Sequence, residues 1–250
     1  MSYTICISTF SLRKKLLENL VKSIRGFVDT DIILGVNGNA NQKFCNTFRR
    51  DVLNLCSRYP NIYPVFFPEQ RGLSKIWNTI LTHSTTDWNL VLNDDVEITS
   101  QSFDSVISNI QNQKDADLVT TMNIYWSHFI INKKVFEKVG YFDERYLGFG
   151  QEDSDFRFRF FKAYGHAVKS IKVDGIKNSD SPTCDSGIVR KGKYSKFNSD
   201  HHFGLSSSKY VLDDNGSREG FPFNVRKVLK DESQYCYETF FSNNKHSLYE

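Results

Sequence analysis

The stretch LVLNDDVEI, residues 90–98, decides how the rest of this chain is interpreted. Its apolar beginning predicts a short buried strand. The strand runs directly into Asn93, Asp94 and Asp95, and adjacent carboxylates are costly to bury unless they are paired or bind a metal ion. Because ligands bind outside the carboxyl ends of strands in open α/β sheets, this stretch predicts a site for a metal ion or a phosphate-bearing substrate.

Strand and helix patterns alternate on both sides of this stretch. Residues 3–9, YTICIST, predict a first strand, and the apolar spacing that follows predicts a helix with Ser11 as its N-cap and Gly26 as its end. Pro64 lies inside a strand pattern and so predicts an edge strand or a bulge. The other predicted strands are 31–36, 62–67, 118–124 and 129–132, and the other predicted helices are 44–55, 73–81, 103–110, 133–139 and 152–164. This alternation is typical of an α/β fold with a Rossmann-like, mostly parallel sheet flanked by helices.

Length and composition predict one folded core with an appendage. The 250 residues are 39% hydrophobic, and 14 Gly and 5 Pro do not indicate a low-complexity chain. Beyond residue 175 the pattern loosens into Ser, Asn, Asp and Lys, with a short helical signal at 225–230. We therefore expect a core over residues 1–175 and a loosely structured C-terminal extension over residues 176–250.

Composition also argues against several classes of protein. The net charge of +3 and the lack of interleaved basic and aromatic residues do not favour a nucleic-acid partner. The five cysteines are scattered without a CxxC pair, so neither a zinc site nor a disulfide framework is indicated. The first strand pattern begins at Tyr3, which leaves no room for a signal peptide, and no apolar run is long enough to span a membrane. We expect a cytoplasmic protein with reduced thiols.

Basic residues cluster at 13–15, 190–196 and 226–227. A solvated surface is the simpler interpretation of these clusters. Contact with acidic ligands, or with the inner face of a membrane, is the alternative. No pattern indicates an oligomeric state.

A second carboxylate group lies in GFGQEDSDFRFRFFKAYG, residues 148–165. Glu152, Asp153 and Asp155 fall in the first turn of a predicted helix that ends at Gly165. Acids at that place complement the helix dipole and cap free N–H groups, but one would suffice. Three acids after a glycine-rich loop therefore leave a catalytic role open, with a carboxylate acting as a base.

Together these segments resemble the inverting glycosyltransferases of family 2, which have the GT-A fold. The resemblance covers residues 3–173 and rests on an ordered set of motifs: YTICISTF, DIILGVNGN, EQRGLSKIWN, LVLNDDVEI and FIINKKVFEKVGYFDERYLGFGQEDSDFRFR. It implies a hexosyltransferase-type enzyme that moves a sugar from a nucleotide-sugar donor to a hydroxyl of a glycan or polysaccharide acceptor.

The resemblance implies a set of donor-binding residues. Thr9 and Asn37 would line the nucleotide base pocket, and Arg71 and Lys75 would approach the base or the diphosphate. Asp94 would lie near the ribose and the metal ion. Asn37 is a departure, because the family's second strand usually ends in an acidic residue.

The resemblance also implies a Mn²⁺ or Mg²⁺ ion bound by Asp95, which would neutralise the leaving diphosphate. Asn93, also counted among the donor-binding residues, stands where the family has the first Asp of its DxD motif. Asp153 would take the proton of the acceptor hydroxyl, with Glu152 beside it contacting the acceptor. That arrangement would give a single displacement with inversion.

A further metal ligand is not obvious in the sequence. Family members often supply a histidine after the base, and here His201 and His202 are the nearest candidates, with Asp180 or Asp185 as oxygen substitutes. A solvent-exposed histidine pair is the alternative. On this hypothesis the extension over residues 176–250 completes the acceptor and metal side.

Three ring-bearing residues are interpreted from their places in the predicted elements. Trp126 would stack on an acceptor sugar or pack in the core, and His128 is interpreted as a satisfied core or cleft histidine. Trp77 lies on the apolar stripe of its predicted helix and is expected in the core.

Two other functions compete with a glycosyltransferase. A nucleotidyltransferase of related fold would need a glycine-rich basic loop after the first strand, and STFSLRKK has no glycine. A non-catalytic module that binds nucleotide sugars would have no need of both Asp95 and Asp153. A dinucleotide-binding fold is not indicated, because no GxGxxG follows a strand.

Overall fold

The computed structural model describes residues 2–10, 13–38, 45–112, 118–146, 148–179, 198, 210–212 and 225–228. The chain divides into two compact units. Unit 1 consists of Met1–Gln70, Thr79–Val135 and Val168–Ser186, and unit 2 consists of Arg71–Asn78, Phe136–Ala167 and Gly187–Glu250. Among the described residues, no helix is both long and apolar enough to cross a membrane.

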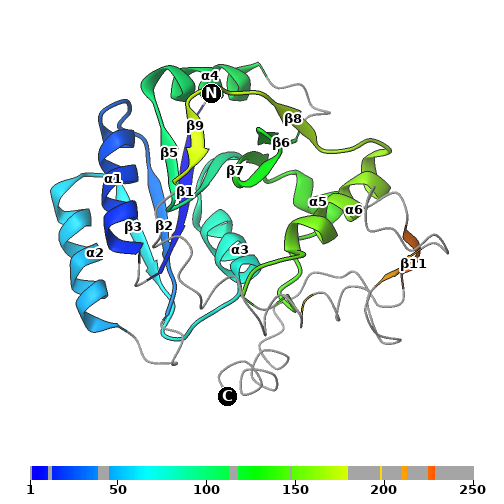
Figure 1. Cartoon of the computed structure of the whole chain (residues 1–250), viewed down its shortest axis with the longest axis horizontal. Coiled ribbons are helices and arrows are strands. Elements are labelled where there is room, and N and C mark those ends of the chain that lie inside the picture. Colours follow the sequence, from blue (N-terminus) through cyan, green and yellow to red (C-terminus); the bar gives the residue numbers. More distant parts are fainter. Residues whose placement is uncertain are drawn as a thin grey trace. The chain divides into compact units, whose positions relative to one another are not determined.

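Unit 1 is built on a seven-stranded sheet in the order β3-β2-β1-β4-β7-β6-β8 (Figure 1). Its strands are β1 Tyr3–Thr9, β2 Ile32–Val36, β3 Ile62–Phe66, β4 Trp88–Asn93, β6 Val119–Met122, β7 Tyr125–Asn132 and β8 Lys169–Ile171. Strand β1 is parallel to β2 and β4, and β2 is parallel to β3. Strands β6 and β8 are parallel to each other, whereas β7 is antiparallel to β4 and β6. The predicted mostly parallel sheet is confirmed. Pro64 lies on the edge strand β3, where its missing N–H leaves no ladder partner unpaired.

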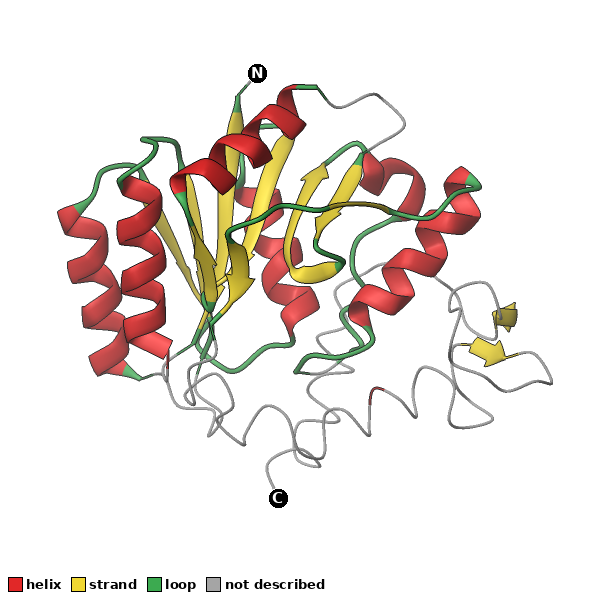
Figure 2. Ribbon diagram, turned by 45° about the horizontal axis from the view of Figure 1, so that its top comes forward, coloured by secondary structure: helices red, strands yellow, loops and turns green. Residues whose placement is uncertain are grey.

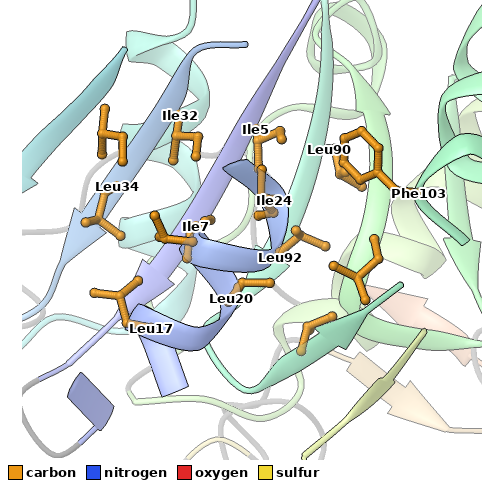
Figure 3. Packing of buried hydrophobic residues seen from close by; sticks show 14 of the residues in the cluster. Ile5, Ile7, Leu17, Leu20, Ile24, Ile32, Leu34, Leu90, Leu92 and Phe103 are labelled. Carbon is orange, nitrogen blue, oxygen red and sulfur yellow. The ribbon is translucent and has the colours of Figure 1, made fainter. Parts of the chain in front are cut away.

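Helices cover both faces of this sheet. Helices α1 Lys14–Arg25, α2 Asn46–Arg58 and α4 Ser100–Gln111 place their apolar stripes on one face, and Figure 2 shows α1 and α2 side by side there. In Figure 3, Leu17, Leu20 and Ile24 of α1 lie over the isoleucines of β1. On the opposite face the Cys6 thiol lies 3.8 Å from the Ile80 carbonyl oxygen of α3, Leu73–His83. Burial of these stripes on the continuous apolar strands is what stabilises the unit.

A second, two-stranded sheet follows the carboxylate stretch. Strand β5, Val96–Ile98, pairs antiparallel with β9, Ile176–Asn178, and the Ser179 N–H donates to the Asp95 carbonyl oxygen at 2.6 Å. The chain therefore leaves β4 through Asp94 and Asp95 and is held immediately afterwards by a distant segment. This pairing limits how far the backbone of the two aspartates can move.

Unit 2 contains α5, Val135–Val139, apart from its first residue, and α6, Glu152–Tyr164. The Phe142 ring lies between Trp77 and Phe156, with ring centroids 5.0 and 4.5 Å away. The predicted core position of Trp77 is confirmed, since 1% of it is exposed. As predicted, both helices are followed by glycines, Gly140 and Gly165, whose φ angles are positive.

The helix predicted at 225–230 is wrong. Residues Val225–Val228 form strand β11, which pairs antiparallel with β10, Tyr210–Leu212. The window is too short for the helical period to be distinguished from a strand, and its backbone groups pair across the ladder with β10.

Candidate active site

The carboxyl ends of β1 and β4 bring Thr9 and Asp94 together, although 85 positions separate them in the sequence. The two strands are parallel neighbours, and the Asp94 N–H donates to the Ser8 carbonyl oxygen at 3.2 Å. The Thr9 hydroxyl donates to Asp94 Oδ2 at 2.7 Å, and the Ser8 hydroxyl donates to Asn93 Oδ1 at 3.0 Å. Thr9, Asn93 and Asp94 therefore share one edge of the sheet, as predicted for parallel strands.

Arg13 binds both aspartates at this edge. Its Nη1 lies 2.8 Å from Asp94 Oδ1 and 3.0 Å from Asp95 Oδ2, and its guanidinium lies over the Phe10 ring, 4.7 Å from the centroid. Only 7% of Arg13 is exposed. The interpretation of residues 13–15 as a solvated basic surface is therefore wrong for Arg13, because the buried Asp94 and the partly buried Asp95 draw the guanidinium inward. This role of Arg13 was not predicted from the sequence. The one signal for it was the position of an arginine just after the first strand.

Burial and Arg13 act in opposite directions on Asp94. Burial is the larger effect and raises the pKa of Asp94 to about 6, while Arg13 and the Thr9 hydroxyl lower it. The negative charge of Asp95 raises it further. At neutral pH Asp94 is therefore still mostly ionised, and the pair retains charge that can attract a cation.

The side-chain oxygens at this edge fit a divalent cation. Asp95 Oδ1 is buried and accepts no hydrogen bond from any described residue, while its Oδ2 contacts Arg13. Mg²⁺ is commonly bound by one or two carboxylates together with substrate phosphates and water, and oxygen ligands also suit Mn²⁺. Asp95 would hold such an ion, which would neutralise charge on a bound diphosphate.

The predicted third metal ligand is not tested. His201, His202, Asp180 and Asp185 all lie outside the described residues. Within the described part of the chain, no group of three or more His, Cys, Asp or Glu side chains is arranged to hold a metal ion. A cation at Asp95 would therefore depend on ligands from outside that part or from the substrate.

Asn37 lies at the same sheet edge, at the end of β2. Its N–H donates to the Thr9 carbonyl oxygen at 2.8 Å, and the residue is half-buried. At Gly38 a Cβ atom would fall 2.2 Å from the Glu69 backbone, so the chain can pass this closely only because residue 38 has no side chain. The edge of unit 1 thus gathers Thr9, Asn37, Asn93, Asp94 and Asp95.

The acids of α6 in unit 2 differ in their contacts. Asp155 is fully buried and pairs with Arg159 at 2.8 Å, and Arg159 Nη2 also donates to the Tyr141 carbonyl oxygen at 2.9 Å. Asp155 therefore orients Arg159, and Arg159 joins the helix to the chain after α5.

Glu152 and Asp153 are held differently from the two aspartates of unit 1. The buried Glu152 carboxylate accepts the Gly150 N–H, and burial, followed by the charge of Asp153, raises the pKa of Glu152 to about 8. Asp153 is partly exposed, and burial of its carboxyl raises its pKa as well. A carboxylate whose pKa is raised is suited to accept a proton near neutral pH.

Asn198 secures the loop in front of α6. Its side-chain amide donates to the carbonyl oxygens of Gly150 at 2.9 Å and Phe149 at 3.3 Å, and the residue is fully buried. Sequence reasoning missed Asn198, since a single asparagine in a polar segment carries no recognisable pattern. Only folding places it against the loop.

Arg71 and Lys75 belong to unit 2, around the start of α3. Lys75 Nζ lies 3.3 Å from Glu144 Oε2, and the Asn78 side chain donates to Glu144 Oε1 at 3.0 Å. A Cβ atom at Gly72 would fall 2.5 Å from the Tyr146 carbonyl oxygen, so glycine is required there. This segment therefore packs closely against the loop that precedes α6, and the donor-binding roles of Arg71 and Lys75 stay predictions.

His128 and Trp126 are both core residues of unit 1. His128 is fully buried, its Nδ1 lies 3.0 Å from the Ser127 hydroxyl, and burial lowers its pKa to about 4. Trp126 is 9% exposed and packs on Phe129, with ring centroids 5.0 Å apart. The neighbouring Tyr125 is 54% exposed. Tyr125, rather than Trp126, is therefore the ring available for stacking on a ligand.

The stretch that carries both carboxylate pairs matches a known family model. Residues 67–180 match the model described as "Glycosyltransferase like family 2". The match covers just under half of the chain, so this segment is similar to that family. The matched segment contains Asp94, Asp95, Glu152 and Asp153. No curated protein matches the chain.

Solved glycosyltransferases share the fold. A mannosyltransferase from Pyrobaculum calidifontis in complex with GDP-Man and Mn²⁺ aligns with a TM-score of 0.55 at 12% identity, over 68% of this chain and 54% of its own. Glucosyl-3-phosphoglycerate synthase from Mycobacterium tuberculosis, in complex with Mn²⁺ and UDP, aligns with a TM-score of 0.59 at 10% identity, over 84% and 83%. TarS of S. aureus aligns with a TM-score of 0.53 at 13% identity, over 72% and 36%. The expected GT-A fold is confirmed, and the chain spans about half of the mannosyltransferase and about a third of TarS.

Proposed function

We propose that this protein is a metal-dependent inverting glycosyltransferase. It transfers a sugar from a nucleotide-sugar donor to a hydroxyl of a glycan or polysaccharide acceptor in a single displacement. The observation that carries this proposal is that the matched segment, residues 67–180, contains two pairs of carboxylates. The guanidinium of Arg13 contacts the pair Asp94–Asp95, and the pKa values of the pair Glu152–Asp153 are raised.

The edge of unit 1 is suited to bind the donor. Asp95 keeps one buried oxygen for Mn²⁺ or Mg²⁺, and the bound ion would neutralise the leaving diphosphate. Thr9 orients Asp94 near the ribose, and Asn37 contributes a polar edge for the base. The Mn²⁺ complexes of the mannosyltransferase and of glucosyl-3-phosphoglycerate synthase support a nucleotide-sugar donor and this choice of ion.

In unit 2 we assign the base to Asp153. Asp153 is a partly exposed residue and the pKa of its carboxylate is raised by burial, so it accepts a proton more readily than an ordinary aspartate would. Glu152 is buried against the Gly150 N–H, and burial raises its pKa to about 8, so it takes up a proton more readily than an ordinary glutamate. In its protonated form it would contact the acceptor as a hydrogen-bond donor. Asp155 is excluded from both roles by its ion pair with Arg159.

The test is a panel of UDP-, GDP- and dTDP-sugars, each measured for binding and slow hydrolysis with and without Mn²⁺. The proposal expects at least one nucleotide sugar to bind only in the presence of Mn²⁺ and to be hydrolysed slowly. Binding without hydrolysis or transfer would favour a non-catalytic module. No response to any donor would overturn the proposal.

A further inference from the structure

We propose that Arg13 is an internal cation that competes with the divalent metal ion for Asp95. Arg13 thereby sets how weakly the metal ion binds before a donor arrives. The inference rests on the proposed function in one respect, because that function makes Asp95 the metal ligand. Arg13 is a positioning residue, since it would act on the metal ion through the aspartates.

The contact geometry supports competition. A single nitrogen, Arg13 Nη1, lies within 3.0 Å of oxygens from both Asp94 and Asp95. A cation that binds Asp95 on this side must either displace that nitrogen or stand beside it. The side chains of Arg13, Asp94 and Asp95 are 8%, 1% and 14% exposed, so little water screens the repulsion between the two cations.

The charges at this edge leave a driving force for exchange. Two carboxylates share one guanidinium nitrogen, so a divalent ion brings charge that the single guanidinium does not supply. The buried Asp95 Oδ1 accepts no hydrogen bond from a described residue, so a cation bound to it displaces no hydrogen bond among those residues. Asp94 remains held by the Thr9 hydroxyl when the guanidinium withdraws from Asp95.

Helix α1 does not depend on the side chain of Arg13 for its N-cap. Arg13 is the residue just before α1, and its side chain makes no capping hydrogen bond to the helix. The helix is anchored by Leu17, Leu20 and Ile24 in the apolar core. Movement of the Arg13 side chain therefore leaves α1 in place.

The decisive experiment is a Mn²⁺ titration without nucleotide, followed by electron paramagnetic resonance of free Mn²⁺, on the full chain. Arg13→Met keeps the length of the side chain and removes its charge, and we expect it to bind Mn²⁺ about tenfold or more tightly than the wild type. Arg13→Lys keeps the charge and should stay within about threefold of the wild type. An affinity of Arg13→Met equal to or weaker than that of the wild type would overturn the inference.

Lys14→Met is the matched control. It removes the same charge one residue further along, where Lys14 pairs with Asp51 at 3.0 Å. We expect no change in Mn²⁺ affinity, because the competition depends on contact with Asp95 and not on net charge. Equal tightening in Lys14→Met and Arg13→Met would overturn the inference.

Stability gives a second measurement. Without its guanidinium the Asp94–Asp95 pair is uncompensated, so Arg13→Met should melt at a lower temperature than the wild type, and Mn²⁺ should raise its melting temperature more than that of the wild type. Arg13→Gln should behave in the same way. Variants that stay unfolded at saturating Mn²⁺ would also contradict the inference, because a competing cation should replace the guanidinium.

Asp95→Asn separates this inference from the proposed function. If Asp95→Asn loses Mn²⁺ binding while Arg13→Met binds it like the wild type, only the competition fails. If Asp95→Asn binds Mn²⁺ like the wild type, the metal assignment of the proposed function fails, and the inference fails with it.

Discussion

Two pairs of adjacent carboxylates, Asp94–Asp95 in unit 1 and Glu152–Asp153 in unit 2, are held in opposite ways. A buried guanidinium contacts both members of the first pair, whereas Glu152 of the second is held by a backbone N–H. The pKa of Asp94 is raised only to about 6, but that of Glu152 is raised to about 8. The first pair is thus suited to hold a cation and the second to exchange a proton. The same residue types acquire different chemistry from their neighbours.

The largest effect is expected from Asp153→Asn. An amide cannot accept the proton of the acceptor hydroxyl, so sugar transfer should fall by roughly 10²- to 10⁴-fold while donor binding is unchanged. Transfer kinetics and donor calorimetry on the same preparation measure the two quantities. Transfer at the wild-type rate would show that Asp153 is not the base.

Asp95→Ala tests the proposed metal-binding role of the pair Asp94–Asp95. Loss of the proposed metal ligand should weaken Mn²⁺-dependent donor binding on the order of 10²-fold and leave any metal-independent binding intact. Calorimetry with and without Mn²⁺ separates the two. Asp51→Ala is the control, since its carboxylate pairs with Lys14 and is not part of the proposed site. Undiminished Mn²⁺-dependence in Asp95→Ala would refute the metal assignment.

Glu152→Gln should change how stability depends on pH. The pKa of Glu152 is raised from 4.5 to about 8 in the folded protein, so the folded state binds this proton more tightly than the unfolded state. The wild type should therefore lose stability as the pH rises from about 4.5 to about 8, by an amount on the order of a few kcal/mol. Glu152→Gln mimics the protonated form and should lose less over the same range, as measured by urea denaturation at each pH. Parallel curves for the two proteins would contradict the raised pKa.

The smallest effect is expected from Asn198→Ala. The variant removes two hydrogen bonds to the Phe149 and Gly150 carbonyl oxygens, which loosens the loop that donates to Glu152. We expect a decrease in transfer rate of about tenfold or less, together with a change in the pH profile as Glu152 becomes more hydrated. Asn198→Asp should be worse, because its carboxylate would face two carbonyl oxygens. An unchanged rate and pH profile would remove Asn198 from the positioning of this loop.

Much of the framework was predictable from local pattern. The apolar run at residues 90–92 became β4, Pro64 fell on an edge strand, and Gly140 and Gly165 follow the ends of their helices. The helix predicted at 225–230 failed because a six-residue window carries too little periodicity to overrule pairing with a distant strand. Elements with long, consistent patterns were predicted, and short ones depended on their partners.

The sequence by itself determined where the carboxylates stand. They lie at the end of an apolar strand and in the first turn of a helix, because apolar periodicity and glycine positions are local properties of the chain. Only the tertiary structure decided what each carboxylate does. Folding brought Arg13 onto Asp94 and Asp95, placed Arg159 on the Tyr141 carbonyl oxygen, and placed Asn198 on the loop before Glu152. Burial and charge contacts shift a pKa, and both depend on residues that are distant in sequence but close in space.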